Sequence, residues 1–196
     1  KKGWPLHEHT MSRVTISQFL DLVREIAVHT PEVKKLRWTL AHALGISEDD
    51  IIRASDLGVA IAVHSQAMMN SRSRNRPPLG SLDRSNVLWG IGSDGAVVAP
   101  INPFLTLGWA VTGRNIAGQE AWSGDQRVSR KSALRAHTLS NAKMLFKEKE
   151  IGSLEVGKLA DMVVLDRDYM TVERDQISQL RPFMTITNGR VVFEQK

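Results

Sequence analysis

The sequence predicts an α/β protein built on a parallel sheet, followed by a separate β segment. Through the first 150 residues, short apolar runs alternate with segments of helical periodicity, which is typical of βα units. The runs lack polar alternation, as expected of strands buried on both faces. From residue 151 onward three strand-like runs occur instead, and the last two flank an Asn-Gly turn. We therefore divide the chain into residues 1–150 and residues 151–196.

The first unit begins with a strand over residues 4–9. A helix follows, because apolar residues recur at helical spacing before Thr30-Pro31 ends the run. Those apolar residues are Ile16, Phe19, Leu20, Val23 and Ile26.

The second unit begins with a strand over residues 36–42. Ser47 precedes Asp50 by three residues, which is close to a capping box, and Gly58 suits the position after a helix end. Residues 59–63 and 87–92 are the third and fourth strands.

A helix is expected over residues 102–114, starting near Pro103, and another from Ser129 to Phe146. The strands of the second segment are expected over residues 161–165, 184–187 and 190–193.

Composition limits the class of protein. The chain has 196 residues, of which 42% are hydrophobic and 24% charged, and no apolar run reaches the roughly 18 residues of a membrane span. Without cysteine, a metal must be held by histidine and carboxylate. The opening KKGWPLHEH has neither an initiator Met nor a signal pattern, so we interpret the chain as a piece of a longer polypeptide. We expect a soluble protein, cytoplasmic rather than secreted, whose targeting region is not observable.

The net charge of +5 suggests nucleic acid or an anionic substrate as a binding partner. The densest basic stretch contains Arg72, Arg74, Arg76 and Arg84, with Asp83 among them and no aromatic residue to stack on a base. We interpret it as a surface loop and expect no nucleic-acid partner.

Asp94 is the most informative residue, because GIGSDG places a carboxylate among small residues just after a buried strand. Such a carboxylate can bind a metal or accept a proton, since small neighbours let a substrate approach closely. Taken alone, it is better explained by a turn that Asp94 caps.

Spacing brings two histidines into the same pattern. His9 and His42 end predicted strands and lie 33 residues apart, close to the roughly 31 residues of one unit in a (β/α)8 barrel. From His42 to Asp94 there are 52 residues, room for two compact units. The three side chains would meet at the carboxyl ends of parallel strands, where barrels carry their chemistry. His7 would lie on the same strand face as His9, so the sequence pattern does not decide which of the two is the ligand. His64 follows the third strand, and we expect it to contact the substrate.

Several stretches resemble the amidohydrolase superfamily of metal-dependent hydrolases, in the branch called amidohydrolase family 3. They are WTLAHALGISEDDIIRASDLGVAIAV, GIGSDGAVVAPINPF, ALRAHTLSNAKML, IGSLEVGKLADMVVLD and TITNGRVVF. The resemblance implies the C-terminal half of a TIM-like (β/α)8 barrel, about strands five to eight, plus part of a small β-sandwich.

The resemblance also implies roles for the candidate residues. His42 matches the strand-six metal ligand, Asp94 the strand-eight carboxylate, and His9 the strand-five ligand. The register favours His9 over His7, because the family run His-Ala-x-Gly-Asp-x-Ala then falls on residues 9–15. The chain departs from that run at Thr10, Ser12 and Arg13. The family's His-x-His pair of strand one is missing, as is the bridging Lys or Glu of strand four.

The chemistry implied is hydrolysis of an amide, cyclic amide or other non-peptide C–N bond of a small molecule. A divalent cation, expected to be Zn²⁺, would activate water, and Asp94 would act as general base and then acid. Residues 65–86 would help to shape the substrate pocket. Half of the ligands are missing, so we expect the isolated chain to be inactive or impaired.

An alternative from another class is a non-catalytic binding or assembly module on a half-barrel scaffold. An open parallel sheet exposes edges, which favours a homo-oligomer or association with the missing N-terminal half.

Overall fold

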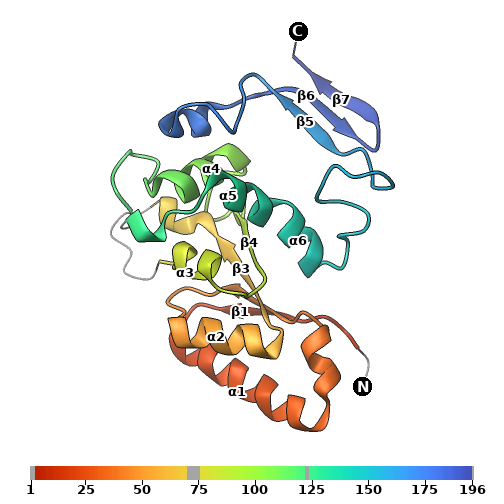
Figure 1. The fold of residues 1–196 in the computed structure, drawn as a ribbon. Coiled ribbons are helices and arrows are strands. Elements are labelled where there is room, and N and C mark those ends of the chain that lie inside the picture. Colours follow the sequence, from red (N-terminus) through yellow and green to blue (C-terminus); the bar gives the residue numbers. More distant parts are fainter. Residues whose placement is uncertain (1–2, 70–75, 122–123, 196) are drawn as a thin grey trace.

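The computed structural model describes residues 3–69, 76–121 and 124–195. Two sheets organise it (Figure 1): a four-stranded parallel sheet in the order β1-β2-β3-β4, and a three-stranded antiparallel sheet near the C-terminus. The parallel strands are β1 (His7–Thr10), β2 (Thr39–His42), β3 (Ala60–His64) and β4 (Trp89–Gly92). The α/β class and the order of the four strands agree with the sequence; β1 and β2 each begin three residues later than expected.

The sheet separates large from small side chains. The register aligns Leu40 with Ile61 and Ile61 with Trp89, so the large apolar side chains share one face. His9, Ala41, Ala62 and Gly90 form the matching row of the other face. The large residues belong to one continuous buried core with the helices, and the small ones leave room at the opposite face.

Two helices cover the first half of the sheet. The helix α1 (Arg13–His29) is capped by Ser12, and the 3-10 helix η1 (Pro31–Lys35) follows Thr30. The helix α2 (Glu48–Leu57) is capped by Ser47 and ends at Gly58, which has φ +67°. A side chain on Gly58 would lie 2.1 Å from the carbonyl oxygen of Lys34. Both this close approach and the positive φ therefore require glycine at this position.

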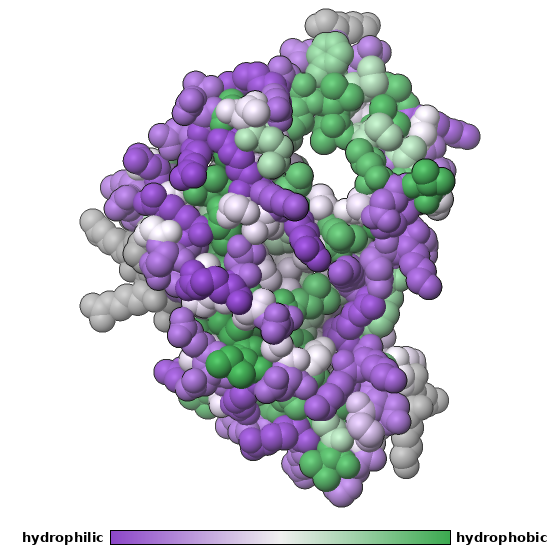
Figure 2. Space-filling model, in the orientation of Figure 1, coloured by the Kyte–Doolittle hydropathy of each residue, from purple (hydrophilic) through white to green (hydrophobic). Residues whose placement is uncertain are grey.

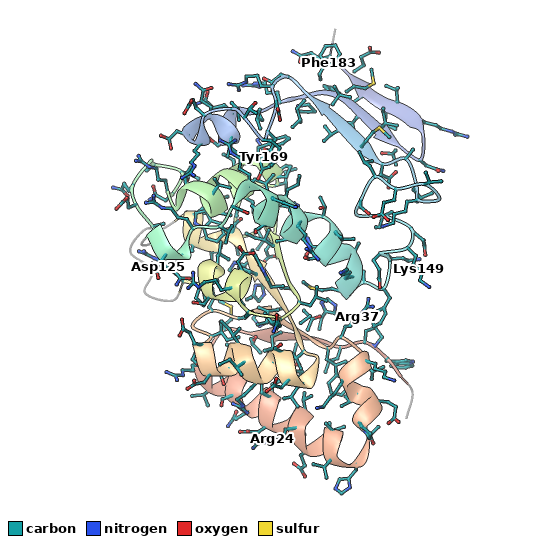
Figure 3. All side chains as sticks on the ribbon, in the orientation of Figure 1. Arg24, Arg37, Asp125, Lys149, Tyr169 and Phe183 are labelled. Atoms are coloured by element: carbon teal, nitrogen blue, oxygen red, sulfur yellow. The ribbon has the colours of Figure 1, made fainter. Side chains whose placement is uncertain are left out.

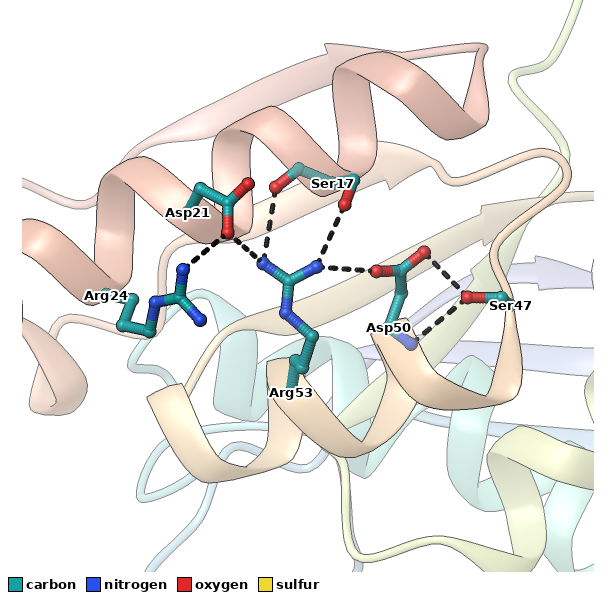
Figure 4. A network of polar contacts seen from close by, with 6 residues as sticks. All are labelled: Ser17, Asp21, Arg24, Ser47, Asp50 and Arg53. Atoms are coloured by element: carbon teal, nitrogen blue, oxygen red, sulfur yellow. Dashed lines mark hydrogen bonds and ion pairs between the residues drawn. The ribbon is translucent and has the colours of Figure 1, made fainter.

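Arg53 joins α1 to α2 (Figure 4). Its guanidinium donates to Ser17 Oγ at 2.9 Å, to Asp21 Oδ1 at 2.6 Å and to Asp50 Oδ1 at 2.9 Å. Asp50 is 4% exposed and also accepts a hydrogen bond from Ser47 Oγ. The N-cap of α2 and the α1–α2 contact therefore share one polar network.

Three short elements and one longer helix follow β3 and β4. They are η2 (Ser65–Met68), α3 (Leu79–Arg84), α4 (Pro103–Thr112) and η3 (Gly124–Gln126). The helix α3 falls in a segment expected to be a loop. η3 packs against it so closely that a side chain on Gly80 would lie 2.0 Å from the Asp125 carbonyl oxygen. Arg72 and Arg74 of the basic stretch lie outside the described residues.

The single helix expected from Ser129 to Phe146 is wrong, because the chain forms α5 (Arg130–His137) and α6 (Leu139–Met144). The break lies at Thr138, which has φ −123° and ψ −88°. Its Oγ1 donates to the carbonyl oxygen of Leu134 at 2.7 Å, a side-chain bond that competes with the helical one and bends helices.

The antiparallel sheet contains β5 (Met162–Leu165), β6 (Pro182–Thr187) and β7 (Arg190–Glu194), and η4 (Arg174–Gln179) precedes β6. Asn188 and Gly189 form the hairpin turn with φ +49° and +74°, as the Asn-Gly pair predicts. Many apolar side chains of this sheet are exposed, and Figure 2 shows them gathered at the top of the molecule.

The segment between β5 and β6 packs on the first part of the chain. Tyr169 is buried beside α5 (Figure 3), its hydroxyl donates to the Arg130 carbonyl oxygen at 3.0 Å, and burial raises its pKa to about 12. η4 lies against α4, where Gly108 leaves room for Ser178. None of the helices in the described ranges has both the length and the apolar composition that a membrane span requires.

Candidate metal centre

Three histidines meet at the carboxyl ends of three neighbouring strands. The ring centroids of His9 and His42 lie 4.4 Å apart, and those of His42 and His64 lie 4.3 Å apart, both pairs in edge-to-face geometry. The residues come from β1, β2 and β3. The imidazole of His42 is thus the middle member of a row that crosses the sheet.

The backbone of His42 makes this row possible. Strict alternation along β2 would place His42 on the face of Leu40, opposite to His9 and His64. His42 instead has φ +72° and Ala43 has φ +48°, a left-handed conformation that is costly for residues with a Cβ. The conformation turns the imidazole toward His9 and His64. Backbone strain of this kind is often found at functional sites.

His42 has an unsatisfied nitrogen. Its Nδ1 is buried and has no hydrogen-bond partner among the residues that the structure describes, an arrangement that normally costs free energy. Burial lowers the pKa of His42, the His9 imidazole lowers it further, and the Asp94 charge opposes both. A neutral imidazole with a free nitrogen lone pair is the form that binds a metal.

His64 is held as one tautomer. The backbone N–H of Gln66 donates to His64 Nδ1 at 3.2 Å, so the proton of the neutral ring belongs on Nε2. Burial lowers the pKa of His64, the His42 imidazole adds to this effect, and Asp94 acts against it. His64 therefore presents an N–H donor, which differs from the lone pair that a metal ligand needs.

Asp94 follows β4 in a left-handed turn. It has φ +51°, is exposed, and its carbonyl oxygen accepts a hydrogen bond from the N–H of Val98. Its carboxylate lies close enough to His42 and His64 for its charge to raise the pKa of both rings. The next residue must be small, since a side chain on Gly95 would lie 2.3 Å from the Ile101 side chain.

The structure thus brings His9, His42 and His64 together and leaves Asp94 near them. No group of three or more His, Asp or Glu side chains in the described ranges is arranged to hold a metal ion. His7 is exposed, and no ring contact of it is seen in the described part of the chain. The donor types fit a divalent cation, and His42 Nδ1 offers a nitrogen for one.

Sequence reasoning missed two buried hydroxyl contacts beside the histidines. Thr10 is fully buried, and its hydroxyl donates to the Ala41 carbonyl oxygen at 3.0 Å, which holds β1 against β2. Ser65 and Thr106 share a hydrogen bond of 3.1 Å between η2 and α4. No pattern in the sequence identifies the second pair, because its partners lie 41 positions apart.

Polar side chains at the carboxyl ends of parallel strands are typical of α/β enzymes, which bind ligands at this edge. The sequence profile of the Amidohydrolase family matches residues 1–193. The chain belongs to the amidohydrolase family.

A relative and two solved structures illustrate the likeness. A 5-methylthioadenosine/S-adenosylhomocysteine deaminase of Symbiobacterium thermophilum is 30% identical over 79% of this chain and 37% of its own length. A metal-dependent hydrolase from Pyrococcus horikoshii superposes with a TM-score of 0.72 at 22% identity, covering 88% of this chain and 36% of that one. A mutant atrazine chlorohydrolase of Arthrobacter aurescens, complexed with zinc and atraton, superposes with a TM-score of 0.72 at 22% identity. That match covers 98% of this chain and 45% of the chlorohydrolase. The chain therefore spans less than half the length of each.

Proposed function

We propose that this chain is part of a metal-dependent hydrolase of the amidohydrolase type, which cleaves a non-peptide C–N bond of a small molecule with activated water. The observation that carries the proposal is the row of His9, His42 and His64 at adjoining strand ends. Family membership and the strained backbone of His42 support it.

The fold suits a partial barrel. Parallel strands in sequential order, each followed by a helical segment, make up consecutive βα units. We propose that β1 to β4 are about strands five to eight of a (β/α)8 barrel, that residues 1–150 form this part, and that residues 151–196 belong to a small β-sandwich. The lengths of the relatives support this, since the chain covers 37% of the deaminase.

His9, His42 and Asp94 are the proposed protein ligands of a divalent cation, and Zn²⁺ suits imidazole donors. A bound cation supplies Lewis acidity and lowers the pKa of water to about 7. His42 would contribute Nδ1, which is the buried nitrogen without a partner in the described residues.

The chain's own residues provide the proton transfers and the orientation. Asp94 would accept a proton from the attacking water on a carboxylate oxygen and deliver it to the leaving nitrogen, which departs as an amine or ammonia. The Nε2–H of His64 would donate to the oxygen or ring atom of the substrate on which negative charge develops. The substrate class follows the deaminase relative and the family: amides, cyclic amides and amino-substituted heterocycles.

Metal binding by the 196-residue chain tests the ligands. We expect Zn²⁺ titrated into chelator-treated protein to bind by calorimetry, and His42→Ala to weaken binding at least about tenfold. His9→Ala should weaken it similarly, while the matched variant His7→Ala should not. Equal effects of His7→Ala and His9→Ala would contradict the assignment.

Activity is tested in a longer protein that includes this chain. With Zn²⁺ or Mn²⁺ and a panel of N-acyl, cyclic amide and adenosine-type substrates, we expect hydrolysis that Asp94→Asn reduces at least about a hundredfold. The thermal midpoint of the variant, measured beside that of the wild type, serves as the control for folding. Full activity in Asp94→Asn would remove this residue from the mechanism.

A non-catalytic assembly module is the second candidate, favoured by exposed apolar surface. A hollow of about 990 Å³ lies between the helices α5 and α6 and strand β5, lined by Leu134, Leu139, Leu145, Ile151 and Met162 among others. Figure 2 shows the molecule hollowed below the C-terminal sheet. We propose that the rest of a longer protein, or a second copy, covers this surface.

A further inference from the structure

An arginine-lined pocket lies apart from the histidines, between the end of α4, the start of α5 and the segment that leads into η4. It has a volume of about 430 Å³. Its charged lining residues are Arg114, Arg127, Arg130, Glu173, Arg174 and Asp175. Four arginines face two carboxylates, so the pocket carries a positive charge.

Two of the arginines are fixed by the fold. Arg130 donates from both terminal nitrogens to the carbonyl oxygens of Tyr169 and Val172. Arg127 donates from Nη2 to Glu120 Oε1 at 2.9 Å, and its Nε is buried without a partner among the described residues. A guanidinium has five N–H donors, so both Arg127 and Arg130 keep N–H groups that can donate to a ligand.

The other two arginines are less committed. Arg114 donates from Nη1 to the Gly118 carbonyl oxygen at 3.3 Å and lies 3.9 Å from Asp175, and both contacts are exposed. The side chain of Arg174 makes no hydrogen bond or ion pair within the ranges that the structure describes. The native structure therefore gains little from Arg174 itself, and its charge is available to a ligand.

A second hollow of about 290 Å³ adjoins the pocket and shares Thr112, Arg114, Arg174 and Asp175 with it. Its apolar lining residues include Leu105, which is partly exposed, and Ile116, which is 54% exposed, whereas Met68 and Trp109 are almost fully buried. The two hollows together present a cationic end and an apolar end. None of the lining residues is one of the proposed metal ligands.

We propose that this pocket binds a small amphiphilic anion, with a phosphate or carboxylate against Arg127 and Arg174 and an apolar body against Leu105 and Ile116. Guanidinium groups suit both oxyanions, because they can donate two parallel hydrogen bonds to either. The inference is independent of the proposed reaction, since it uses different residues.

Calorimetry on the 196-residue chain tests the proposal, with a chelator present to prevent anions from binding to a metal. The probes are phenyl phosphate, benzoate and inorganic phosphate. We expect one saturable site for phenyl phosphate or benzoate, and the tighter of the two identifies the head group. Inorganic phosphate should bind more weakly, because it lacks the apolar body. Equal affinity for inorganic phosphate would overturn the role of the apolar end.

Two variants make the test specific. Arg174→Ala should weaken the tighter probe about tenfold or more, since it removes a charge-assisted contact. Arg24→Ala, which removes a charge of α1 paired with the exposed Asp21 and remote from the pocket lining, should leave affinity unchanged. The thermal midpoints of both variants check folding. Absence of saturable binding, or equal weakening in the two variants, would refute the site.

Discussion

At the scale of single residues, His42 shows how a strand end becomes a site. A residue in regular β conformation would point its side chain toward the large apolar face, where an imidazole has no polar partner. The φ of +72° moves the ring to the side of His9 and His64. The strained backbone of His42 thus places three imidazoles in a row, and two of them have lowered pKa values.

Buried histidines also make stability depend on pH. His137 lies in α5, and burial lowers its pKa below the ordinary value of 6.5. Between the lowered value and 6.5 the unfolded chain binds a proton that the folded chain does not, so the free energy of unfolding falls as the pH decreases through about 6.5. Denaturant titrations of the metal-free chain from pH 8 to pH 5 measure this slope.

His137→Gln should reduce that slope, by at most about 1.4 kcal/mol per pH unit. The matched variant His29→Gln removes an exposed imidazole at the end of α1 and should retain the wild-type slope. A slope unchanged by His137→Gln would show that His137 does not contribute to the pH dependence of stability.

At the scale of elements, Arg53 connects two helices that the sequence pattern predicts independently of each other. It bonds Ser17 and Asp21 of α1 while neutralising Asp50 of its own helix. Asp50 is the most buried carboxylate of this network and also supports the N-cap Ser47. The capping motif is local, yet the charge that balances it also holds the neighbouring helix.

Arg53→Ala should therefore lower the free energy of unfolding by about 2 kcal/mol or more, because it leaves a buried carboxylate without its cation. Arg24 contacts the same Asp21 from an exposed position, and Arg24→Ala should cost less than about 0.5 kcal/mol. Denaturant unfolding measures both. Equal costs would mean that Arg53 acts only as a surface charge.

At the scale of the whole molecule, the C-terminal sheet exposes residues that usually lie in a core. Val163 is 47% exposed and Phe193 46%, and both pair with Thr185 along the same row of the sheet. Both outer strands also present unpaired edges. Apolar faces and open edges favour association.

We expect the isolated chain to self-associate through this sheet, with a sedimentation coefficient that rises with concentration. Phe193→Glu should shift the equilibrium toward the monomer by about tenfold or more, because the substitution places a charge in the apolar contact. Val28→Glu alters an apolar residue of α1 that is even more exposed, at 74%, and serves as the control. A wild-type chain that stays monomeric at every concentration would contradict the expectation.

The sequence by itself determined the βα alternation, the caps Ser47 and Ser129, the Gly58 helix end, the Asn-Gly hairpin and the family, because each depends on residues close together in the chain. Only the tertiary structure decided the break at Thr138, the helix α3 and the meeting of His64 with His42. Helix α3 packs closely against η3, which lies far away in sequence, and the histidine contacts depend on the register of strands far apart in sequence. His42 combines the two levels: its position at a strand end could be predicted, whereas the left-handed turn that aims its ring is visible only in the folded chain.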